Sequence, residues 1–263
     1  MPKIESKYIY GGTSEVGFEM DVNEDYFHFQ ALREDVLVLA VADGMGSLPS
    51  TLQPAAIASI EAIQACDRLF KKDPDVFLEN PTMMLQEAMY VANRVLGAFK
   101  IANEQRYAGF GCSMLLILVY SKNKFAFAQC GNTRLSQIRI KQDGSININQ
   151  MTTEHTVAME LFESGIISAE DYYYHPDRYK LTSGIGIVSD PEIQLYSGRL
   201  KKGDIILATT DGIHYGIRPE AMARFVVDAD NWEAASKALT TAATMEKVPD
   251  NATAALIYIT EES

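Results

Sequence analysis

Acidic side chains recur beside the apolar stretches of this 263-residue chain. Five of them stand where a predicted strand begins or ends: Glu24, Asp25, Asp43, Asp211 and Asp250. A strand end is a rigid support, so carboxylates from neighbouring strands can converge on one point. Several carboxylates at contact distance raise one another's pKa unless a cation lies between them. The pattern therefore predicts a divalent metal site.

The donor types indicate which metal such a site would hold. Oxygen donors without a nearby His or Cys cluster favour hard ions, Mg²⁺ or Mn²⁺, over zinc. Taken singly, the segments favour plainer interpretations as turns or solvated loops, as for Asn23–Asp25, Asp43-Gly44, Asp211-Gly212 and Asp250-Asn251. Their shared position at strand ends favours a common site.

Two strands are predicted at 26–32 and 35–42, and the short break between them predicts an antiparallel hairpin. Further apolar runs bounded by turn residues predict strands at 112–120, 124–130, 135–141, 204–210 and 252–260. The first three of these runs follow one another through short turns. They are therefore predicted to form an antiparallel meander.

Apolar residues spaced three and four apart predict two long helices, at 54–70 and from 81 to about 105. Shorter helices are predicted at 156–164, 168–174, 219–228 and 231–245. The segment 172–189 fits neither period and is predicted to be an ordered loop or flap. Antiparallel strands with paired helices favour a layered α+β fold, and no linker or repeat divides the chain, so one domain over 1–263 is expected.

Composition excludes several classes of protein. Thirty-five acidic and 23 basic residues give a net charge of −12, which repels a nucleic-acid backbone. No apolar run approaches the roughly 20 residues that span a membrane, so neither nucleic acid nor a membrane is expected as a partner. The first ten residues carry charges where a signal peptide is apolar, which predicts a cytoplasmic location. The cysteines match neither a zinc site nor a disulfide framework and are predicted core residues: Cys66, Cys112 and Cys130.

Eight short motifs follow one another along the chain. They are Asn23-Glu-Asp25, Ala42-Asp-Gly-Met-Gly46, Gly111-Cys-Ser113, Gly131-Asn-Thr-Arg134, Thr153-Glu-His155, His175-Pro-Asp-Arg178 with Leu181-Thr182, Gly203-Asp204 leading to Thr210-Asp-Gly212, and Asp250-Asn-Ala-Thr253. Together they resemble the metal-dependent protein phosphatase 2C family, particularly its short prokaryotic members, from about residue 17 to 259. The resemblance implies a four-layer αββα sandwich, in which helix pairs flank two central antiparallel sheets and a two-metal site lies at one end.

The resemblance also implies a role for each acidic residue. Asp43 would bridge two Mg²⁺ or Mn²⁺ ions, and the Gly44 carbonyl would bind one of them. Asp211 and Asp250 would hold the other ion. Glu24, with Asp25 beside it, would orient metal-bound waters or the bridging carboxylate, and Asn251 would support Asp250.

The reaction that the resemblance implies is hydrolysis of phosphoserine or phosphothreonine esters by a water that bridges the two ions, without a covalent enzyme intermediate. Asp43, Glu24, Asp25 and Asp211 would be the catalytic residues. The expected partner is a phosphorylated protein, and the enzyme is expected to be a monomer.

Three positions depart from the family pattern. Met20 stands where an Arg usually grips the substrate phosphate, so weaker phosphate binding is expected unless Arg178 or Lys180 takes its place. Asn132 removes a carboxylate associated with a third metal, so a third ion is not expected. Tyr215 stands where an acidic residue is common.

The four histidines receive mainly structural interpretations. His214 could donate a proton to the leaving alkoxide, but a structural hydrogen bond is favoured. Met45 cannot be that acid. His28, His155 and His175 are also predicted to be structural.

Two functions remain open. The leading one is a metal-dependent serine/threonine protein phosphatase, because every residue matched to the metal pair is present. The alternative is a catalytically weak pseudophosphatase that binds a phosphoprotein or another partner, which Met20, Asn132 and Tyr215 would favour. An amidohydrolase of similar architecture would need an N-terminal nucleophile, and 1–3 offer none.

Overall fold

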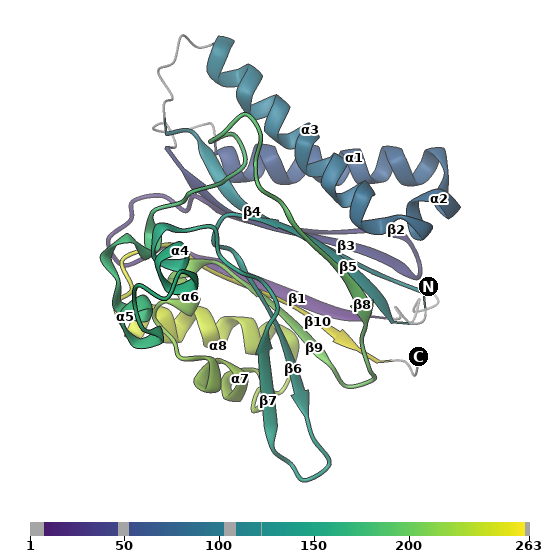
Figure 1. Cartoon of the computed structure of the whole chain (residues 1–263). Helices are drawn as coiled ribbons and strands as arrows, with labels where there is room; N and C mark the ends of the chain where they lie inside the picture. The colour runs from purple at the N-terminus through teal and green to yellow at the C-terminus, as the bar shows by residue number, and fades with distance from the viewer. Residues whose placement is uncertain (1–7, 47–52, 103–108, 122, 261–263) are drawn as a thin grey trace.

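Ten β-strands and nine helical segments make up the computed structural model, which describes residues 8–46, 53–102, 109–121 and 123–260. The strands are β1 (Tyr8–Glu15), β2 (Asp25–Arg33), β3 (Val36–Met45), β4 (Gly111–Tyr120), β5 (Lys124–Cys130), β6 (Arg134–Ile140), β7 (Ile146–Gln150), β8 (Gln194–Arg199), β9 (Ile205–Thr209) and β10 (Ala252–Ile259). They form two five-stranded antiparallel sheets, with the strand orders β1-β10-β9-β6-β7 and β2-β3-β4-β5-β8. The sheets stack face to face (Figure 1).

Helices cover both outer faces of the sheet pair. They are α1 (Pro54–Lys72), α2 (Pro74–Glu79), α3 (Pro81–Ala102), α4 (Val157–Glu163), α5 (Ala169–Tyr174), α6 (Asp211–His214), α7 (Pro219–Val227) and α8 (Trp232–Met245), with a 3₁₀ turn η1 (Pro176–Tyr179). The long helices α1 and α3 pack on the sheet that contains β3, and α7 and α8 pack on the other (Figure 1). The predicted four-layer α+β sandwich is confirmed. Among the described residues, no helix is both long and apolar enough to cross a bilayer.

The core is divided by the alternation of side chains along the central strands. In β3, Val38 and Ala40 pack toward α1 and α3, whereas Leu39 and Val41 pack into the layer between the sheets. Successive side chains of a strand point to opposite faces, so the next position on the inner side after Val41 is Asp43. The β3 side chains that face the other sheet are thus apolar up to Val41 and end with the polar Asp43.

The facing sheet repeats this arrangement. Ala208 of β9 and Ala255 of β10 pack into the same inter-sheet layer. Two residues further toward the same end of the sandwich, the inner rows reach Thr210 and Thr253. Polar residues from both sheets therefore meet at one end of the inter-sheet layer.

Several predicted elements are confirmed, and one connection is wrong. The hairpin of β2 and β3 forms as predicted, and the three cysteines are buried with free thiols. The predicted meander is wrong at its third strand, because β6 pairs with β7 and β9 in the other sheet. Gly131, with φ +98°, lies in the turn where the chain leaves β5 and crosses between the sheets. The predicted helix end near residue 105 lies outside the described residues.

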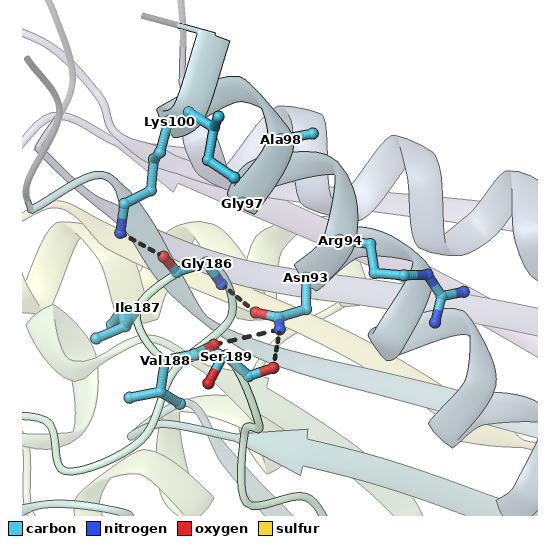
Figure 2. Close-up of a pocket in the computed structure, with 10 residues that line it drawn as sticks. Asn93, Arg94, Gly97, Ala98, Lys100, Gly186, Ile187, Val188 and Ser189 are labelled. Atoms are coloured by element: carbon cyan, nitrogen blue, oxygen red, sulfur yellow. Dashed lines mark hydrogen bonds between the residues drawn. The ribbon is translucent and has the colours of Figure 1, made fainter. Parts of the chain in front are cut away.

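A cavity of about 870 Å³ lies between α3 and the segment 186–189, and its lining contains none of the predicted site residues (Figure 2). Asn93 joins its two walls, because its amide nitrogen donates to the carbonyls of Val188 and Ser189, and its oxygen accepts from the Gly186 nitrogen. Lys100 adds a hydrogen bond to the Gly186 carbonyl. These bonds fix the segment against α3.

Candidate metal centre

The predicted metal site lies where the ends of β2, β3, β9 and β10 meet. Asp25 begins β2 and is the register partner of Asp43 near the end of β3. The Oδ2 atom of Asp25 accepts hydrogen bonds from the Thr210 hydroxyl (2.7 Å) and from the Thr253 hydroxyl (2.6 Å). Both threonines belong to the opposite sheet, so these bonds join the two sheets at the predicted site.

The backbone segments that carry the acidic residues pack directly against one another. A Cβ atom on Gly44 would lie 2.7 Å from the Glu24 carbonyl oxygen, and one on Gly212 would lie 2.0 Å from the Asn251 carbonyl oxygen. Neither gap has room for a side chain, which explains why a glycine follows each aspartate. Asp43 and Asp211 are thereby brought beside the segments of Glu24 and Asp250.

The carboxyl groups sit in a poorly solvated environment that disfavours their charge. Burial, together with the charges of Asp250 and Glu24, raises the pKa of Asp25 to about 7. Burial and then the charge of Asp250 raise the pKa of Asp211 to about 8. Burial and then the charge of Asp211 raise the pKa of Asp43 well above its ordinary value, and burial also raises that of Asp250. Crowded carboxylates of this kind are stabilised by a cation.

Among the described residues, no amide or hydroxyl donates to two buried carboxylate oxygens, Asp25 Oδ1 and Asp211 Oδ1. The other oxygen of Asp211 accepts a hydrogen bond from Asn132 Nδ2 at 3.0 Å. A buried polar atom without a partner is costly unless a ligand completes it. Oxygen donors of this type suit Mg²⁺ or Mn²⁺.

The arrangement is not a closed ligand cage. Within the described parts of the chain, no three or more His, Cys, Asp or Glu side chains form a group that could already hold a metal ion. The carboxylates influence one another's pKa, and the side chains of Asp43 and Asp211 are within hydrogen-bonding reach of each other. The donor chemistry fits a hard cation, and binding one would require further oxygen donors to approach this pair.

Asn251 connects two of the acidic segments. Its side-chain oxygen accepts a hydrogen bond from the Glu24 backbone nitrogen at 2.8 Å, and its amide nitrogen donates to the Val22 carbonyl at 3.1 Å. Its backbone nitrogen donates to Asp250 Oδ1 at 2.8 Å. One residue thus fixes the segment of Glu24 beside the carboxylate of Asp250.

The turn that carries Asn132 is anchored by a residue that the sequence analysis did not assign. Ser113 in β4 pairs with Asp43, and its hydroxyl accepts hydrogen bonds from the backbone nitrogens of Asn132 (2.9 Å) and Thr133 (2.7 Å). Ser113 therefore helps to place the amide that contacts Asp211. Thr210 and Thr253 were also left without a role, although all three belong to the quoted motifs.

The loop of Met20 packs beside the segment of Asp250. The backbone nitrogens of Phe18 and Glu19 donate to the carbonyls of Val248 (3.2 Å) and Pro249 (3.3 Å), and the Met20 nitrogen donates to the Gly17 carbonyl. The position of Met20 is therefore near the site. Its thioether supplies no charged donor for a phosphate.

Arg178 lies among tyrosines on the predicted flap. Its guanidinium donates to the Tyr173 carbonyl and to the Tyr179 hydroxyl, and Cζ lies 4.7 Å from the centroid of the Tyr215 ring. The side chain would have to leave these contacts to bind a phosphate. Lys180, the other predicted cation, is exposed.

His214 is fully buried on α6. Its Nδ1 atom lies 2.9 Å from the Thr209 hydroxyl. Its Nε2 atom has no hydrogen-bond partner in the described part of the chain and lies 3.9 Å from Glu154 Oε1. Burial, and then the positive charges of Arg134 and Arg178, lower the pKa of His214 well below its usual value. A neutral, enclosed imidazole favours the structural interpretation over proton donation.

Comparisons with known proteins agree on one family. A family profile described as Protein phosphatase 2C matches residues 19–248. The chain is 23% identical over 253 residues to the protein phosphatase PhpP of Streptococcus pneumoniae, which covers 95% of this chain and 96% of that protein.

Solved structures show the same fold. The structure of the Mycobacterium tuberculosis serine/threonine phosphatase PstP/Ppp aligns with a TM-score of 0.80 at 22% identity, covering 97% of this chain and 99% of that one. The catalytic domain of the serine threonine protein phosphatase PstP in complex with two manganese ions aligns with a TM-score of 0.75 at 20% identity, covering 97% and 99%.

Proposed function

The chain belongs to the protein phosphatase 2C family, and on that premise we propose that it hydrolyses phosphoserine and phosphothreonine esters of proteins with bound Mg²⁺ or Mn²⁺. The observation that carries the proposal is the pair of unpartnered buried oxygens on Asp25 and Asp211, within a group of interacting carboxylates. The names of the relatives, which describe protein phosphatases, support the reaction. The two manganese ions in one structural neighbour support the cofactor.

The acidic residues at the sheet ends are the proposed ligands. Two ions would be held by the carboxylates of Asp43, Asp211, Asp250 and Glu24 together with the carbonyl of Gly44. Held by these residues, such ions would supply a water of lowered pKa and would neutralise the charge that develops on the phosphate ester. The Asn132 amide stands where a further carboxylate would be needed, so we propose two ions and no third.

Asp25 is proposed to orient the attacking water. Its Oδ2 accepts hydrogen bonds from the hydroxyls of Thr210 and Thr253, which fix the plane of the carboxylate. Its Oδ1 accepts no hydrogen bond from any described residue and could accept one from water. Such orientation by a fixed neighbour contributes to rate by keeping the reacting atoms aligned.

Substrate phosphate is expected to bind weakly. Met20 replaces the usual guanidinium, and Arg178 would have to exchange its tyrosine contacts for phosphate oxygens before it could compensate. A reduced activity follows as a proposal. We assign His214 a structural role because its imidazole is buried and neutral.

Several broader expectations remain predictions. We propose that 1–263 form a single catalytic domain that acts as a monomer on phosphorylated proteins in the cytoplasm. The alternative, a catalytically weak pseudophosphatase, is less well supported because Asp43, Asp211 and Asp250 are all retained.

Hydrolysis of an aryl phosphate and of a phosphothreonine peptide tests the proposal. We expect turnover with Mn²⁺, loss of turnover with a chelator, and at least about 100-fold lower activity in Asp43→Ala and Asp211→Asn. Asp143→Asn is the matched control, because Asp143 is an exposed acid in the turn between β6 and β7. Equal rates in all variants, or no turnover by the wild type at any Mn²⁺ concentration, would overturn the proposal.

A further inference from the structure

Tyr215 links the acidic site to the predicted flap. It follows the single-turn helix α6, whose first residue is Asp211, and its backbone nitrogen donates to the Asp211 carbonyl at 2.9 Å. Its hydroxyl lies 2.9 Å from Glu154 Oε2 and 2.8 Å from the Arg178 carbonyl oxygen. Arg178 belongs to η1, so Tyr215 contacts the segment of a proposed metal ligand through its backbone and the flap through its side chain.

Glu154, which lies beside the Tyr215 hydroxyl, is held in place by its own hydrogen bonds. The Glu154 side chain is fully buried, and its Oε1 accepts hydrogen bonds from the Arg134 guanidinium, one of them from Nε at 2.9 Å. Its Oε2 also accepts a hydrogen bond from the Tyr172 hydroxyl on α5. A buried ion pair whose oxygens are satisfied holds its partners in one geometry. Glu154 therefore supplies a rigid anchor for Tyr215 and for the flap.

The first part of the predicted flap, residues 172–179, is called the flap from here on, and it also encloses the Tyr215 ring. The Tyr179 ring packs edge-on against it with centroids 5.1 Å apart, and Arg178 Cζ lies 4.7 Å from its centroid. The Tyr173 hydroxyl donates to the Tyr215 carbonyl at 3.4 Å. Edge-to-face and cation–π contacts of this kind add to the hydrogen bonds. The flap is thus packed around a residue of the acidic segment.

We propose that Tyr215 is a positioning residue that fastens the flap to α6 and thereby holds Asp211 in place, so that binding of a divalent cation at the acidic site and ordering of the flap favour each other. The coupling rests on the proposed function for the identity of the acidic site. Linkage is reciprocal: if a closed flap favours cation binding, the bound cation must shift the equilibrium between open and closed flap toward the closed state by the same factor.

The hydroxyl is the part of Tyr215 that can be removed while the ring contacts with the flap are kept. A phenylalanine would fill the same space and keep the ring contacts with Tyr179 and Arg178. It would lose the hydroxyl, whose single proton can be donated to Glu154 Oε2 or to the Arg178 carbonyl oxygen. Tyr215→Phe therefore tests the hydrogen bonding of the hydroxyl separately from the packing of the ring. Tyr174→Phe is the matched control, because Tyr174 is 64% exposed on the same flap and its hydroxyl accepts a hydrogen bond only from Arg218 among the bonds described.

Two measurements test the coupling between cation binding and flap ordering without measuring turnover. Hydrogen exchange of the flap, residues 172–179, is followed with and without Mn²⁺, and Mn²⁺ affinity is measured by calorimetry. We expect Mn²⁺ to slow flap exchange in the wild type. In Tyr215→Phe we expect metal-free flap exchange to be about 10-fold faster, Mn²⁺ binding to be about 3- to 10-fold weaker, and the slowing by Mn²⁺ to be lost. Tyr174→Phe should match the wild type in all three.

A second variant distinguishes Tyr215 from its anchor. Tyr172→Phe removes a flap hydroxyl from the same Glu154 oxygen without touching α6, so it should speed flap exchange with a smaller effect on Mn²⁺ affinity. An equal loss of affinity in Tyr172→Phe and Tyr215→Phe would overturn the assignment to Tyr215, and so would unchanged affinity in Tyr215→Phe. A wild type that binds no Mn²⁺ would overturn both the proposed function and the coupling. Even then, faster metal-free exchange of the flap in Tyr215→Phe would support the statement that the Tyr215 hydroxyl holds the flap to α6.

Discussion

Asp25 and Asp43 are directly opposed across the β2–β3 ladder, on the side that faces the second sheet. Like charges opposite each other destabilise an antiparallel pair. The pKa of Asp25 is raised to about 7, mainly by burial, and that of Asp43 is raised as well. The fold therefore retains an arrangement that is unfavourable in the absence of a cation, and this has consequences for stability.

The metal-free protein should become less stable as pH rises through the neutral range. The pKa values of Asp25 and Asp211 increase on folding from 3.8 to about 7 and about 8, so the folded state binds more protons than the unfolded state between these values. The contribution of these two residues to stability is then greatest near pH 4 and is lost progressively up to about pH 8. Thermal unfolding between pH 5 and 8.5 at constant ionic strength measures this.

Mn²⁺ should remove most of this pH dependence, because a bound cation lowers the pKa of the carboxylates around it. The thermal midpoint at pH 8 should therefore rise on adding Mn²⁺ by more than it does at pH 5.5. An equal rise at both pH values would mean that the carboxylates do not titrate with metal binding.

Asp25→Asn should raise stability and lower activity together. The amide oxygen can still accept the hydrogen bonds of Thr210 and Thr253, while the charge opposite Asp43 is removed. We expect about 1–3 kcal/mol of added stability for the metal-free protein at pH 8. The rate with Mn²⁺ should fall about 10- to 100-fold. Urea unfolding and phosphopeptide hydrolysis measure the two effects.

Asp35→Asn provides the comparison for this variant. Hydrogen bonding to Arg33 lowers the pKa of Asp35, so removing its charge should cost stability slightly and leave hydrolysis unchanged. A stability loss in Asp25→Asn that matched or exceeded that of Asp35→Asn would contradict the repulsion inferred for the opposed pair.

The sequence predicted the central strands more fully than the edges of the sheets. Residues 36–42 and 112–120 are buried on both faces, so they appear as continuous apolar runs. The strands that were missed, β1, β7 and β8, are all at sheet edges, where half-exposed strands lack such runs. β1 also contains Gly12, where a Cβ would lie 2.7 Å from the Phe27 ring, so close packing required a residue that weakens the strand signal.

At the site, features that depend on local sequence could be predicted, and features that depend on contacts between distant residues could not. The carboxylates could be found from their places at strand ends, because that pattern is local. The role of Thr210 and Thr253 could not, because it depends on Asp25 in the opposite sheet, which is distant in the chain. The position of β6 was wrong for a related reason: a short turn after β5 is compatible with a hairpin or with a crossing to the other sheet.

Two glycine substitutions should have opposite effects. In Gly212→Ala the new Cβ would lie 2.0 Å from the Asn251 carbonyl oxygen, so the backbones must separate. We expect a loss of about 1–3 kcal/mol and a sharp fall in Mn²⁺-dependent activity. In Gly97→Ala the Cβ meets no atom within 4 Å on the helical surface of α3, so about 0.5–1 kcal/mol of stability should be gained with activity unchanged. Urea unfolding measures the change in stability of each variant. A change of the same sign in both would contradict the close backbone contact at Gly212.

Met20→Arg should improve binding of substrate phosphate. The loop of Met20 is held against Val248 and Pro249, next to Asp250, so a guanidinium at this position would lie near the proposed centre. A charge-assisted pair with phosphate is worth about 1.5–3 kcal/mol. We expect KM for an aryl phosphate, and the inhibition constant of inorganic phosphate, to fall about 10-fold or more with little change in kcat.

Two further variants at the same position identify the cause of that improvement. Met20→Lys supplies a point charge without the planar fork and should give a smaller improvement, while Met20→Leu keeps the side chain neutral and should behave as the wild type. A KM that stays the same in Met20→Arg would mean that phosphate is held from another direction. Arg178→Met should then raise KM, because the flap guanidinium would be the cation that had left Tyr179 to contact the phosphate.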